Sequence, residues 1–345
     1  MRGDRVRTLV IGGGQAGVSV GHFLQRGGDD FLIVDAGTEP GQTWRSRWDS
    51  LRLFTAAKHN NLPETRFPGD PDHIPGKDEM AGYLAGYAAG LPLQLDAAVE
   101  QLARDGDRYV ASLADRQIVA DRVVVATGPT GTPRTPDVAG DLAPEIVQVH
   151  SDDYRNPKQL PGGQALVVGA GNSGAEIAIE LAADRPVWLA GRDVGKFPFE
   201  LGGLPYRFMN RLLTTDTKVG RNIAKKTAGS GTPLVRIKAE DVTAAGVRRV
   251  GRVTKAAGGL PVPEGGEAIE PASIVWCTGY VRDYSWIKLP VFDEQGDPIH
   301  RRGVVRNEPG LYFLGLPYLY TMASSLIMGV TKDAEYTAKM ILSRQ

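Results

Sequence analysis

The stretch "VIGGGQAGVSVGHFL", Val10–Leu24, places three glycines, Gly12, Gly14 and Gly17, directly after an apolar run. The spacing G-x-G-x-x-G between a strand and a helix is typical of a turn that binds a dinucleotide. The first glycine allows the tight turn, the second lets a pyrophosphate approach the backbone, and the third lets the helix pack closely on the strand. The N-terminus of the helix would then face the phosphates.

An acidic residue follows at the distance expected for such a unit. The next apolar run, "DFLIVDA", ends in Asp35, about 20 residues after Gly12, where a carboxylate can accept a hydrogen bond from a ribose hydroxyl. The alternative interpretation is a glycine-rich turn without a ligand. A turn without a ligand would not require an acidic residue at this distance. The stretch together with Asp35 therefore favours a nucleotide site.

The stretch "VVGAGNSGAEIAIELA", Val167–Ala182, repeats this pattern in the middle of the chain. Its glycines are Gly169, Gly171 and Gly174, and the next apolar run, "PVWLAGR", ends in Arg192 rather than in an acid. An arginine can pair with a 2'-phosphate through two hydrogen bonds, whereas a carboxylate would repel that phosphate. The second unit therefore predicts NADPH in preference to NADH. The alternative is that Arg192 is a solvated loop residue.

Two dinucleotide units in one chain indicate a flavin together with the nicotinamide that reduces it. The first unit, with its acid, suits FAD. Two more apolar runs, "ADRVVVATGP" and "ASIVWCTGY", end in Thr-Gly pairs, one before the second unit and one after it. Such ends suit points where the chain passes between two nucleotide domains. We therefore predict an α/β fold with two Rossmann-like dinucleotide-binding domains: residues 1–154 and 277–345 for FAD, and an inserted domain, 155–276, for NADPH.

Composition limits the classes of protein that remain. The chain has 345 residues, 42% of them hydrophobic, and 40 basic residues balance 40 acidic ones. This zero net charge gives no general attraction to nucleic acid or to an anionic membrane, so neither is an expected partner. The single cysteine, Cys277, excludes an internal disulfide, a redox dithiol and a thiolate metal cluster. We expect a cytoplasmic protein without a metal.

Several motifs together resemble the class B flavoprotein monooxygenases, which include the flavin-containing monooxygenases, the plant YUCCA enzymes and the Baeyer-Villiger monooxygenases. These motifs are "GQTWRSRWDSLRLFT", "RFPGDPDHIPGKDEMAGYLAGYA", "HSDDY", "VVGAGNSGAEIA" and "WCTGY", and they extend over nearly the whole chain. The compact bacterial members look most similar, because "GLYFLGLP" leads into "SLIMGVTKDAEYTA".

The resemblance implies that NADPH reduces FAD and that the reduced flavin takes up molecular oxygen. A flavin C4a-(hydro)peroxide then delivers one oxygen atom to nitrogen or sulfur of a small molecule. Such a cycle needs a dry pocket, since water and protons hasten the loss of hydrogen peroxide. Trp44, Trp48 and Phe54 would form its wall or pack in the core. Ketone oxygenation is less expected, because "YRNP" lacks the tryptophan of the Baeyer-Villiger signature.

The resemblance also assigns roles at the cofactor sites. Asp35 would hold the FAD ribose, and Gln42 and Trp44 would contact the flavin half, with Arg45 near them. The predicted cofactor-binding set combines the two glycine turns, the residues that end neighbouring strands, and the flavin-facing loops. It comprises Gly12, Gly14, Gln15, Ala16, Gly17, Asp35, Gln42, Trp44, Arg45, Val99, Thr127, Gly128, Gly169, Gly171, Asn172, Ser173, Gly174, Arg192, Thr278, Gly279, Leu316 and Pro317.

The loop "TAAKHNN" would lie beside the isoalloxazine ring, and it holds the predicted catalytic residues Thr55, His59 and Asn60. Thr55 stands where the animal enzymes place an asparagine, which leaves stabilisation of the oxygenated flavin open. His59 could serve as a proton source near neutral pH or as a structural loop residue. His150 of "HSDDY" is expected to orient the linker between the domains rather than to take part in chemistry.

Two further segments complete the prediction. The uncharged stretch Leu311–Val330 is long enough to be taken for a membrane span, but its glycines, proline and serines suit a strand, a loop and the start of a helix. That helix would face the flavin, with Leu316 and Pro317 at the border of the ring. Residues 193–230 carry Phe, Leu, Tyr and Met at roughly helical spacing, which predicts a helical excursion that packs on the NADPH domain, contacts a second copy in a homodimer, or covers the substrate.

The leading hypothesis is an NADPH-dependent FAD monooxygenase that acts on a small molecule. Three other functions stay open. An NADPH oxidase or flavin reductase of the same fold would release hydrogen peroxide, and a reductase of similar shape would pass electrons to ferredoxin. A nucleotide-sensing regulatory protein would use the same turns without catalysis.

Overall fold

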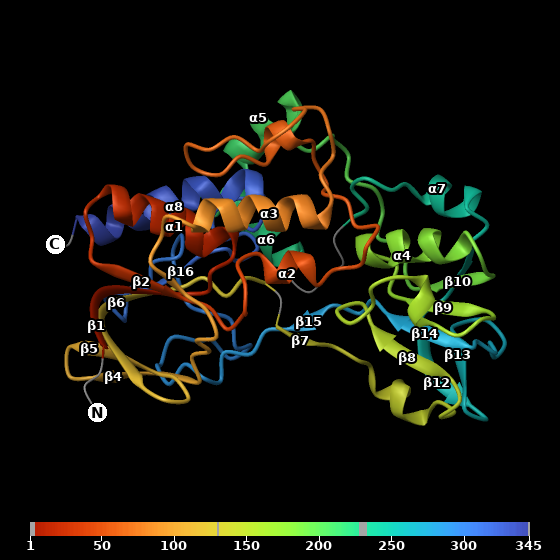
Figure 1. Ribbon diagram of the computed structural model, residues 1–345. Coiled ribbons are helices and arrows are strands. Elements are labelled where there is room, and N and C mark those ends of the chain that lie inside the picture. The colour runs from red at the N-terminus through yellow and green to blue at the C-terminus, as the bar shows by residue number, and fades with distance from the viewer. Residues whose placement is uncertain (1–3, 130, 228–232, 344–345) are drawn as a thin grey trace.

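The computed structural model describes residues 4–129, 131–227 and 233–343. Figure 1 shows two α/β halves side by side, and both chain ends lie at the same half. The first half holds a sheet whose strands come from the N-terminal and C-terminal parts of the chain, while the second half holds a sheet from the middle. This arrangement agrees with the predicted α/β class.

The first sheet has the strand order β3-β2-β1-β6-β5-β4, with β16 also paired to β6. Strands β1, β2, β3, β6 and β16 run parallel, while β5 and β4 form an antiparallel edge. Leu9, Val10 and Ile33 are fully buried, as expected for parallel strands covered on both faces. The bounds are β1 (Asp4–Ile11), β2 (Phe31–Val34), β3 (Leu93–Gln94), β4 (Gln101–Asp105), β5 (Arg108–Ser112), β6 (Gln117–Val125) and β16 (Leu311–Phe313).

Three helices lie together on one side of this sheet in Figure 1. Helix α1 (Gln15–Arg26) packs along α8 (Ile327–Leu342), and α3 (Lys77–Ala88) lies beside α1. The uncharged stretch Leu311–Val330 begins with β16, continues as a loop and ends in the first residues of α8. Within the described ranges, no helix is long and apolar enough to cross a membrane.

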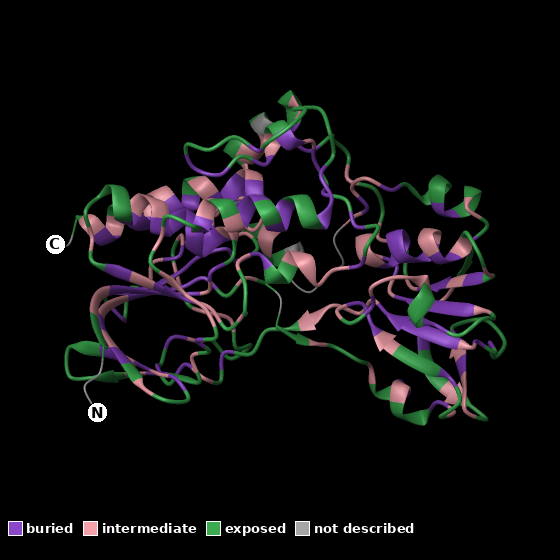
Figure 2. Ribbon diagram, in the orientation of Figure 1, coloured by how far each residue is buried: buried purple, intermediate pink, exposed green. Residues whose placement is uncertain are grey.

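The second sheet has the order β11-β10-β9-β14-β8, and all its strand pairs are parallel. Leu166, Val167 and Ile274 are fully buried in its core, and Figure 2 shows the strands of this sheet mostly in the purple of buried residues. Strand β8 belongs to this sheet although it precedes residue 155, where we expected the inserted domain to start. The bounds are β8 (Val147–His150), β9 (Ala165–Val168), β10 (Val187–Ala190), β11 (Arg248–Val250) and β14 (Ser273–Trp276), with α4 (Asn172–Ala182), α7 (Ala239–Ala244) and a hairpin of β12 (Val253–Ala257) and β13 (Leu260–Pro263).

The chain crosses between the two halves in two short strands that pair with each other. Strand β7 (Thr132–Pro133) leads out of the first half, and β15 (Tyr280–Val281) leads back, antiparallel to it. The Arg134 N–H donates a hydrogen bond to the Gly279 carbonyl at 2.9 Å. A Cβ at Gly131 would lie 2.2 Å from a carbonyl oxygen of β15, so only glycine allows this close crossing. Figure 1 shows the pair midway between the sheets.

The predicted excursion, residues 193–230, leaves the second half after β10 and contains α5 (Leu204–Leu212) and α6 (Lys218–Thr227). Its last three residues lie outside the described ranges. The Thr215 N–H donates to the Tyr320 carbonyl at 2.8 Å, so the excursion reaches the first half of the molecule. The remaining short helices are α2 (Gln42–Arg45), η1 (Ala57–His59), η2 (Asp137–Asp141) and η3 (Pro157–Gln159).

Candidate functional site

The first glycine turn joins β1 to α1, and its glycines differ in their surroundings. Gly12 has φ +109°, and a Cβ there would lie 2.5 Å from the Ala126 carbonyl oxygen. A Cβ at Gly17 would lie 1.8 Å from the Gly12 carbonyl oxygen, so the helix packs directly on the turn. A Cβ at Gly14 would meet no atom within 4 Å. The turn therefore needs two glycines for its own geometry and leaves its backbone uncovered at the third.

Asp35 follows β2 and fixes the shape of this turn. Its carboxylate accepts hydrogen bonds from the Gly13 N–H at 2.5 Å through Oδ2 and from the Gly37 N–H at 2.7 Å through Oδ1. Gln42 braces the next loop, because its Oε1 accepts from the Thr38 N–H at 2.6 Å. The acid is thus positioned by two backbone groups at the rim of the turn, as a ribose-binding carboxylate would be.

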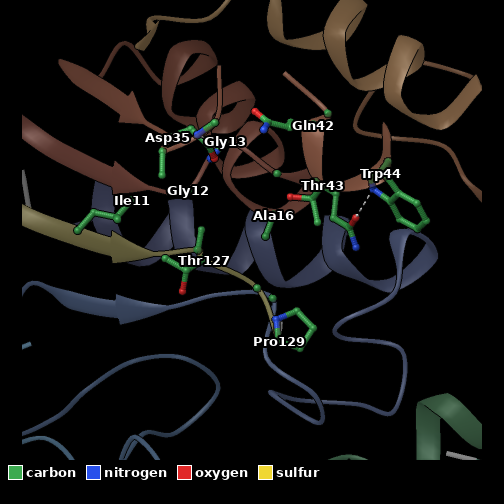
Figure 3. A pocket seen from close by; sticks show the side chains of 18 of the residues that line it. Ile11, Gly12, Gly13, Ala16, Asp35, Gln42, Thr43, Trp44, Thr127 and Pro129 are labelled. Atoms are coloured by element: carbon green, nitrogen blue, oxygen red, sulfur yellow. Dashed lines mark hydrogen bonds between the residues drawn. The ribbon is translucent and has the colours of Figure 1, made fainter. Parts of the chain in front are cut away.

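A cavity of about 740 Å³ opens along the turn, within the size range of ligand sites. Figure 3 shows it bordered by Gly12, Asp35, Gln42, Trp44 and Thr127. Of the predicted cofactor-binding residues, the cavity is lined by Gly12, Gly14, Gln15, Ala16, Asp35, Gln42, Trp44, Val99, Thr127 and Gly128. The uncovered backbone at Gly14 and the acid at its rim fit a dinucleotide in this cavity.

Gln15 links two distant segments across the cavity. The indole Nε1 of Trp44 donates to Gln15 Oε1 at 3.3 Å, as the dashed line in Figure 3 marks, and Gln15 Nε2 donates to the Ser325 carbonyl at 3.1 Å. Ser325 precedes α8 by two residues and lines the cavity. The predicted Leu316 is buried and Pro317 is exposed, and the lining residue next to them is Gly315. Gln15 therefore connects the loop that contains Trp44 to the segment before α8, at the edge of the cavity.

Arg45 lies outside the cavity lining, and its Nε pairs with Glu39 Oε1 at 3.0 Å. Arg47, two residues later, does line the cavity. Trp48 is buried in the core, and Phe54 is exposed, so Trp44 is the aromatic residue of this loop that borders the cavity.

The three predicted catalytic residues lie in the loop around η1, and none of them lines the cavity. Thr55 and Asn60 are both buried and bind each other: the Thr55 hydroxyl donates to Asn60 Oδ1 at 2.8 Å, and Asn60 Nδ2 donates to the Thr55 carbonyl at 3.0 Å. His59 lies under the excursion, since a Cβ at Gly202 would be 2.8 Å from its imidazole. The loop is thus a closed structural unit covered by the start of the excursion.

The second glycine turn, between β9 and α4, repeats the geometry of the first. Gly169 has φ +112°, and its Cβ would lie 2.1 Å from the Cys277 carbonyl oxygen. A Cβ at Gly174 would lie 1.7 Å from the Gly169 carbonyl oxygen, whereas one at Gly171 would meet nothing within 4 Å. The backbone at Gly171 is therefore uncovered in the same way as at Gly14, and the turn fits a second pyrophosphate.

Three more predicted residues surround this second turn. Asn172 ties it to the segment after the excursion, because its Oδ1 accepts from the Val235 N–H at 2.9 Å. Ser173 lies in the first turn of α4 and is partly buried. Arg192 follows β10, is exposed, and forms no hydrogen bond or ion pair with any residue in the described ranges. Its guanidinium is thus available to a ligand.

A polar cluster at the junction of the halves was missed as a site by sequence reasoning. Asp152 Oδ1 accepts from Arg47 at 3.0 Å and from the Tyr280 hydroxyl at 2.7 Å, and all three residues line the cavity. The guanidinium also lies over the Tyr280 ring, 5.5 Å from its centre. Burial raises the pKa of Tyr280 to about 12. The motifs "GQTWRSRW", "HSDDY" and "WCTGY" each contain one member, but only the fold brings the three together.

His150 and the Thr278–Gly279 pair belong to the same junction. His150 Nδ1 accepts from the Asp152 N–H at 3.1 Å, and its Nε2 lies 3.1 Å from the Gly279 carbonyl, to which it donates. Burial lowers the pKa of His150, which favours this neutral form. Thr278 donates its hydroxyl to the Arg134 carbonyl. These contacts make His150, Thr278 and Gly279 part of the connection between the halves.

Replacing Asp152 by alanine is expected to destabilise the chain by about 1–3 kcal/mol. Arg47 is mostly buried and would lose its carboxylate partner, and a buried group without its partner costs this much. Thermal unfolding with a matched variant, Asp115→Ala, checks the value, because Asp115 pairs with Arg116 at the surface and should contribute less than about 1 kcal/mol. Equal effects of the two substitutions would show that the cluster has no stabilising role.

Cys277 limits the redox chemistry that the chain can perform. It is the single cysteine, and it lies against the second glycine turn. Burial raises the pKa of its thiol to about 12, so the thiol stays protonated near neutral pH. The chain therefore has no dithiol with which to reduce a disulfide.

Comparison with known proteins identifies the class. Residues 9–194 match the family described as pyridine nucleotide-disulphide oxidoreductase. An uncharacterized CzcO-like oxidoreductase of Geobacillus kaustophilus is 38% identical over 98% of this chain and 99% of its own length. The indole-3-pyruvate monooxygenase YUCCA1 of Oryza sativa is 27% identical over 97% of this chain and 91% of its own length.

A solved structure has the same overall fold. The flavin-containing monooxygenase from Stenotrophomonas maltophilia is 28% identical, covers 99% of both chains and gives a TM-score of 0.79. The fold and its two glycine turns thus define a flavin-dependent oxidoreductase with two Rossmann-type domains, which confirms the predicted fold class and enzyme class. The chain belongs to the pyridine nucleotide-disulphide oxidoreductase family.

Proposed function

We propose that the chain is an NADPH-dependent FAD monooxygenase that oxygenates nitrogen or sulfur of a small molecule. One observation carries the proposal: two glycine turns of the same geometry lie in one chain that has a single cysteine. A flavin that has been reduced by a nicotinamide cannot pass its electrons to a dithiol of this chain, because the chain has only one cysteine. We therefore take molecular oxygen as the electron acceptor. The likeness to flavin monooxygenases at 28% identity supports this assignment.

The two cofactors divide between the halves as follows. FAD would occupy the cavity along the first turn, where the backbone at Gly14 would hold its pyrophosphate and Asp35 its ribose. NADPH would bind at the second turn, where the backbone at Gly171 would hold its pyrophosphate and Arg192 its 2'-phosphate. In this division, the FAD domain comprises 1–154 and 277–345 and the NADPH domain 155–276, except that strand β8 extends the NADPH side toward the N-terminus.

The chain itself supplies binding, orientation and shielding. When bound, FAD would supply the acceptance of a hydride from NADPH and the activation of molecular oxygen, as in class B monooxygenases. Gln15 holds Trp44 against the start of α8, and this contact fixes the wall of the flavin cavity. The Arg47–Asp152–Tyr280 cluster fixes how the halves meet where the nicotinamide must reach the flavin.

The inner face of the excursion supports its assignment as a wall over the reaction site. Tyr206 and Leu201 pack with Ala323 in a buried apolar cluster, and the Ala323 N–H donates to Asn210 Oδ1 at 3.3 Å. Gly202 covers His59. The excursion therefore excludes water from the loop that sequence analysis places beside the flavin ring, and a dry site favours transfer of oxygen over loss of hydrogen peroxide.

The test is consumption of NADPH by the purified, flavin-loaded enzyme with methyl phenyl sulfide or dimethylaniline as probe substrates. We expect the sulfoxide or the N-oxide to form in proportion to the NADPH consumed. Rapid mixing of the reduced enzyme with oxygen should give a flavin adduct before reoxidation. Purified protein that neither contains nor binds a flavin would refute the proposal.

A second candidate is an NADPH oxidase that releases hydrogen peroxide. It is favoured by the Thr55 hydroxyl, which donates to Asn60 inside the loop and leaves no donor directed toward the cavity at the position where the animal enzymes have an asparagine. Hydrogen peroxide equal to NADPH consumed, whatever substrate is added, would select this function.

Replacing Thr55 by valine is expected to raise the fraction of NADPH that ends as hydrogen peroxide. Valine keeps the shape of the side chain but loses the bond to Asn60, which costs about 1–3 kcal/mol because the buried Asn60 Oδ1 loses its donor. The loop beside the flavin then loosens and admits water. Thr55→Ser keeps the hydroxyl and should retain the wild-type yield. An unchanged peroxide yield in Thr55→Val would separate the loop from oxygen transfer.

A further inference from the structure

The hydroxyl of Tyr206, on the inner side of α5, is buried and has no hydrogen-bond partner in the described part of the chain. Tyr206 is 1% exposed, and its hydroxyl oxygen meets no donor or acceptor among the described residues. A buried hydroxyl in a folded protein normally forms a hydrogen bond, because leaving it without one costs free energy. Phenylalanine would fill the same place without that cost. The hydroxyl is therefore available to a molecule that the chain does not itself supply.

Tyr206 lies between the two predicted cofactor sites. It packs in an apolar cluster that also contains Val235 and Ala323. Val235 is held at the second glycine turn, because its N–H donates to Asn172 Oδ1 at 2.9 Å. Ala323 comes two residues before Ser325, which lines the cavity along the first turn. The cluster therefore joins a segment beside the predicted NADPH site to a segment beside the predicted flavin site, and a substrate of such an enzyme has to reach this region.

The side chains that pack with Tyr206 carry no charge. An ion that entered this cluster would lose its water without gaining a counter-charge from the cluster, which is costly. Six of the side chains are only partly buried, so they still have surface with which to contact a ligand. Three of those six are methionines, whose flexible thioethers adapt to molecules of different shape. These surroundings suit a neutral, mainly apolar molecule. Besides Tyr206, the cluster consists of Phe197, Leu201, Met209, Val235, Met322, Ala323, Leu326 and Met328.

We propose that Tyr206 is a substrate-binding residue, whose hydroxyl donates a hydrogen bond to an acceptor atom of a neutral, mainly apolar substrate. Burial raises the pKa of Tyr206 to about 12, so the phenol keeps its proton near neutral pH and can donate it. The methionines and Phe197 would contact the apolar part of the same molecule. The inference rests on the proposed oxygenation for the reacting nitrogen or sulfur, and it adds the class of substrate and the residue that orients it.

A second buried tyrosine provides the comparison that the test needs. Tyr284 is 9% exposed, and its hydroxyl also lacks a partner among the described residues. It packs against Phe292 and Phe313 in the core of the first half, and it does not line the cavity along the first turn. The two tyrosines thus share an unpartnered hydroxyl, but of the two only Tyr206 lies between the cofactor sites. Tyr284→Phe therefore removes the same atom as Tyr206→Phe at a place where no substrate is expected.

The test is calorimetric titration of the purified, full-length protein, with FAD present and NADPH absent. The probes are methyl phenyl sulfide and its 3-acetyl and 4-acetyl derivatives, in which the ketone oxygen is the added acceptor. We expect an acetyl derivative to bind the wild type more tightly than methyl phenyl sulfide does. Tyr206→Phe should weaken binding of that derivative roughly 3- to 10-fold, the effect of one neutral hydrogen bond, and should leave methyl phenyl sulfide unaffected. 4-(Methylthio)benzoate, which is charged, should bind the wild type at least roughly tenfold more weakly than the acetyl derivative.

Tyr284→Phe is the matched control and should bind every probe like the wild type. Tyr206→Phe should unfold at the wild-type temperature or above, because it loses no hydrogen bond within the described protein. Equal losses for all probes in Tyr206→Phe, no loss for either acetyl derivative, preferred binding of the benzoate, or no binding of any probe overturns the proposal. Binding that depends on Tyr206 without any oxygenated product would refute the proposed function alone, whereas product formation with unchanged affinities in Tyr206→Phe would refute this inference alone.

Discussion

Replacing Gly14 by alanine is expected to leave the chain folded and to lower its affinity for FAD at least roughly tenfold, or about 1.4 kcal/mol. A Cβ at this position meets no protein atom, and the backbone there has φ −72°, which alanine adopts without strain. The methyl group would instead project into the space that the pyrophosphate must enter. Titration of the flavin-free protein with FAD, together with thermal unfolding, measures both effects.

Two glycine variants give this experiment its controls. Gly86→Ala on the exposed side of α3 also meets open space, so it should leave FAD affinity unchanged and stabilise the helix by roughly 0.5–1 kcal/mol. Gly17→Ala would place its Cβ 1.8 Å from a carbonyl oxygen and should disrupt the turn itself. Wild-type affinity in Gly14→Ala would mean that the pyrophosphate binds elsewhere.

Replacing Arg192 by alanine should abolish most of the preference for NADPH over NADH. One charge-assisted pair with a 2'-phosphate contributes about 1.5–3 kcal/mol, so kcat/KM for NADPH should fall roughly 10- to 150-fold. The value for NADH should stay nearly the same, because its ribose has no phosphate at that position. Arg192 pairs with no described carboxylate, so its removal leaves no unpaired partner in the protein.

Arg248→Ala is the matched control for this experiment. Arg248 is also exposed, but it begins β11, the parallel strand next to β10, and lies level with Trp188 rather than beyond the end of β10, where Arg192 is. Its removal should change the values for NADPH and NADH equally or not at all. Equal losses for both nucleotides in Arg192→Ala would assign that arginine to general attraction rather than to recognition of the phosphate.

The glycine turns and the strands around them could be predicted because each depends on neighbours close in sequence. Gly12 is required by the positive φ of the turn and Gly17 by its contact with the Gly12 carbonyl, and Asp35 comes at a distance fixed by one helix and one strand. The same local pattern occurs at Gly169 and Gly174. Where the conformation of a short segment depends on its own residues, that conformation can be predicted from the sequence of the segment.

The contacts between segments could not be predicted in the same way. Helix α2 is a single turn, so four residues give no periodicity from which to tell that Arg47, rather than Arg45, would border the cavity. The bond between Thr55 and Asn60 depends on the 3-10 turn that lies between them. Asp152 meets its partners only after both halves have formed.

The paired strands β7 and β15 have a consequence for how such a chain can change over generations. The middle segment enters and leaves the first half at adjacent positions, where the Arg134 N–H binds the Gly279 carbonyl. A gene could therefore gain, lose or exchange the segment between β7 and β15 without changing the order of the strands in the first sheet. The residues that follow the two turns can then differ, as Asp35 after the first and Arg192 after the second illustrate.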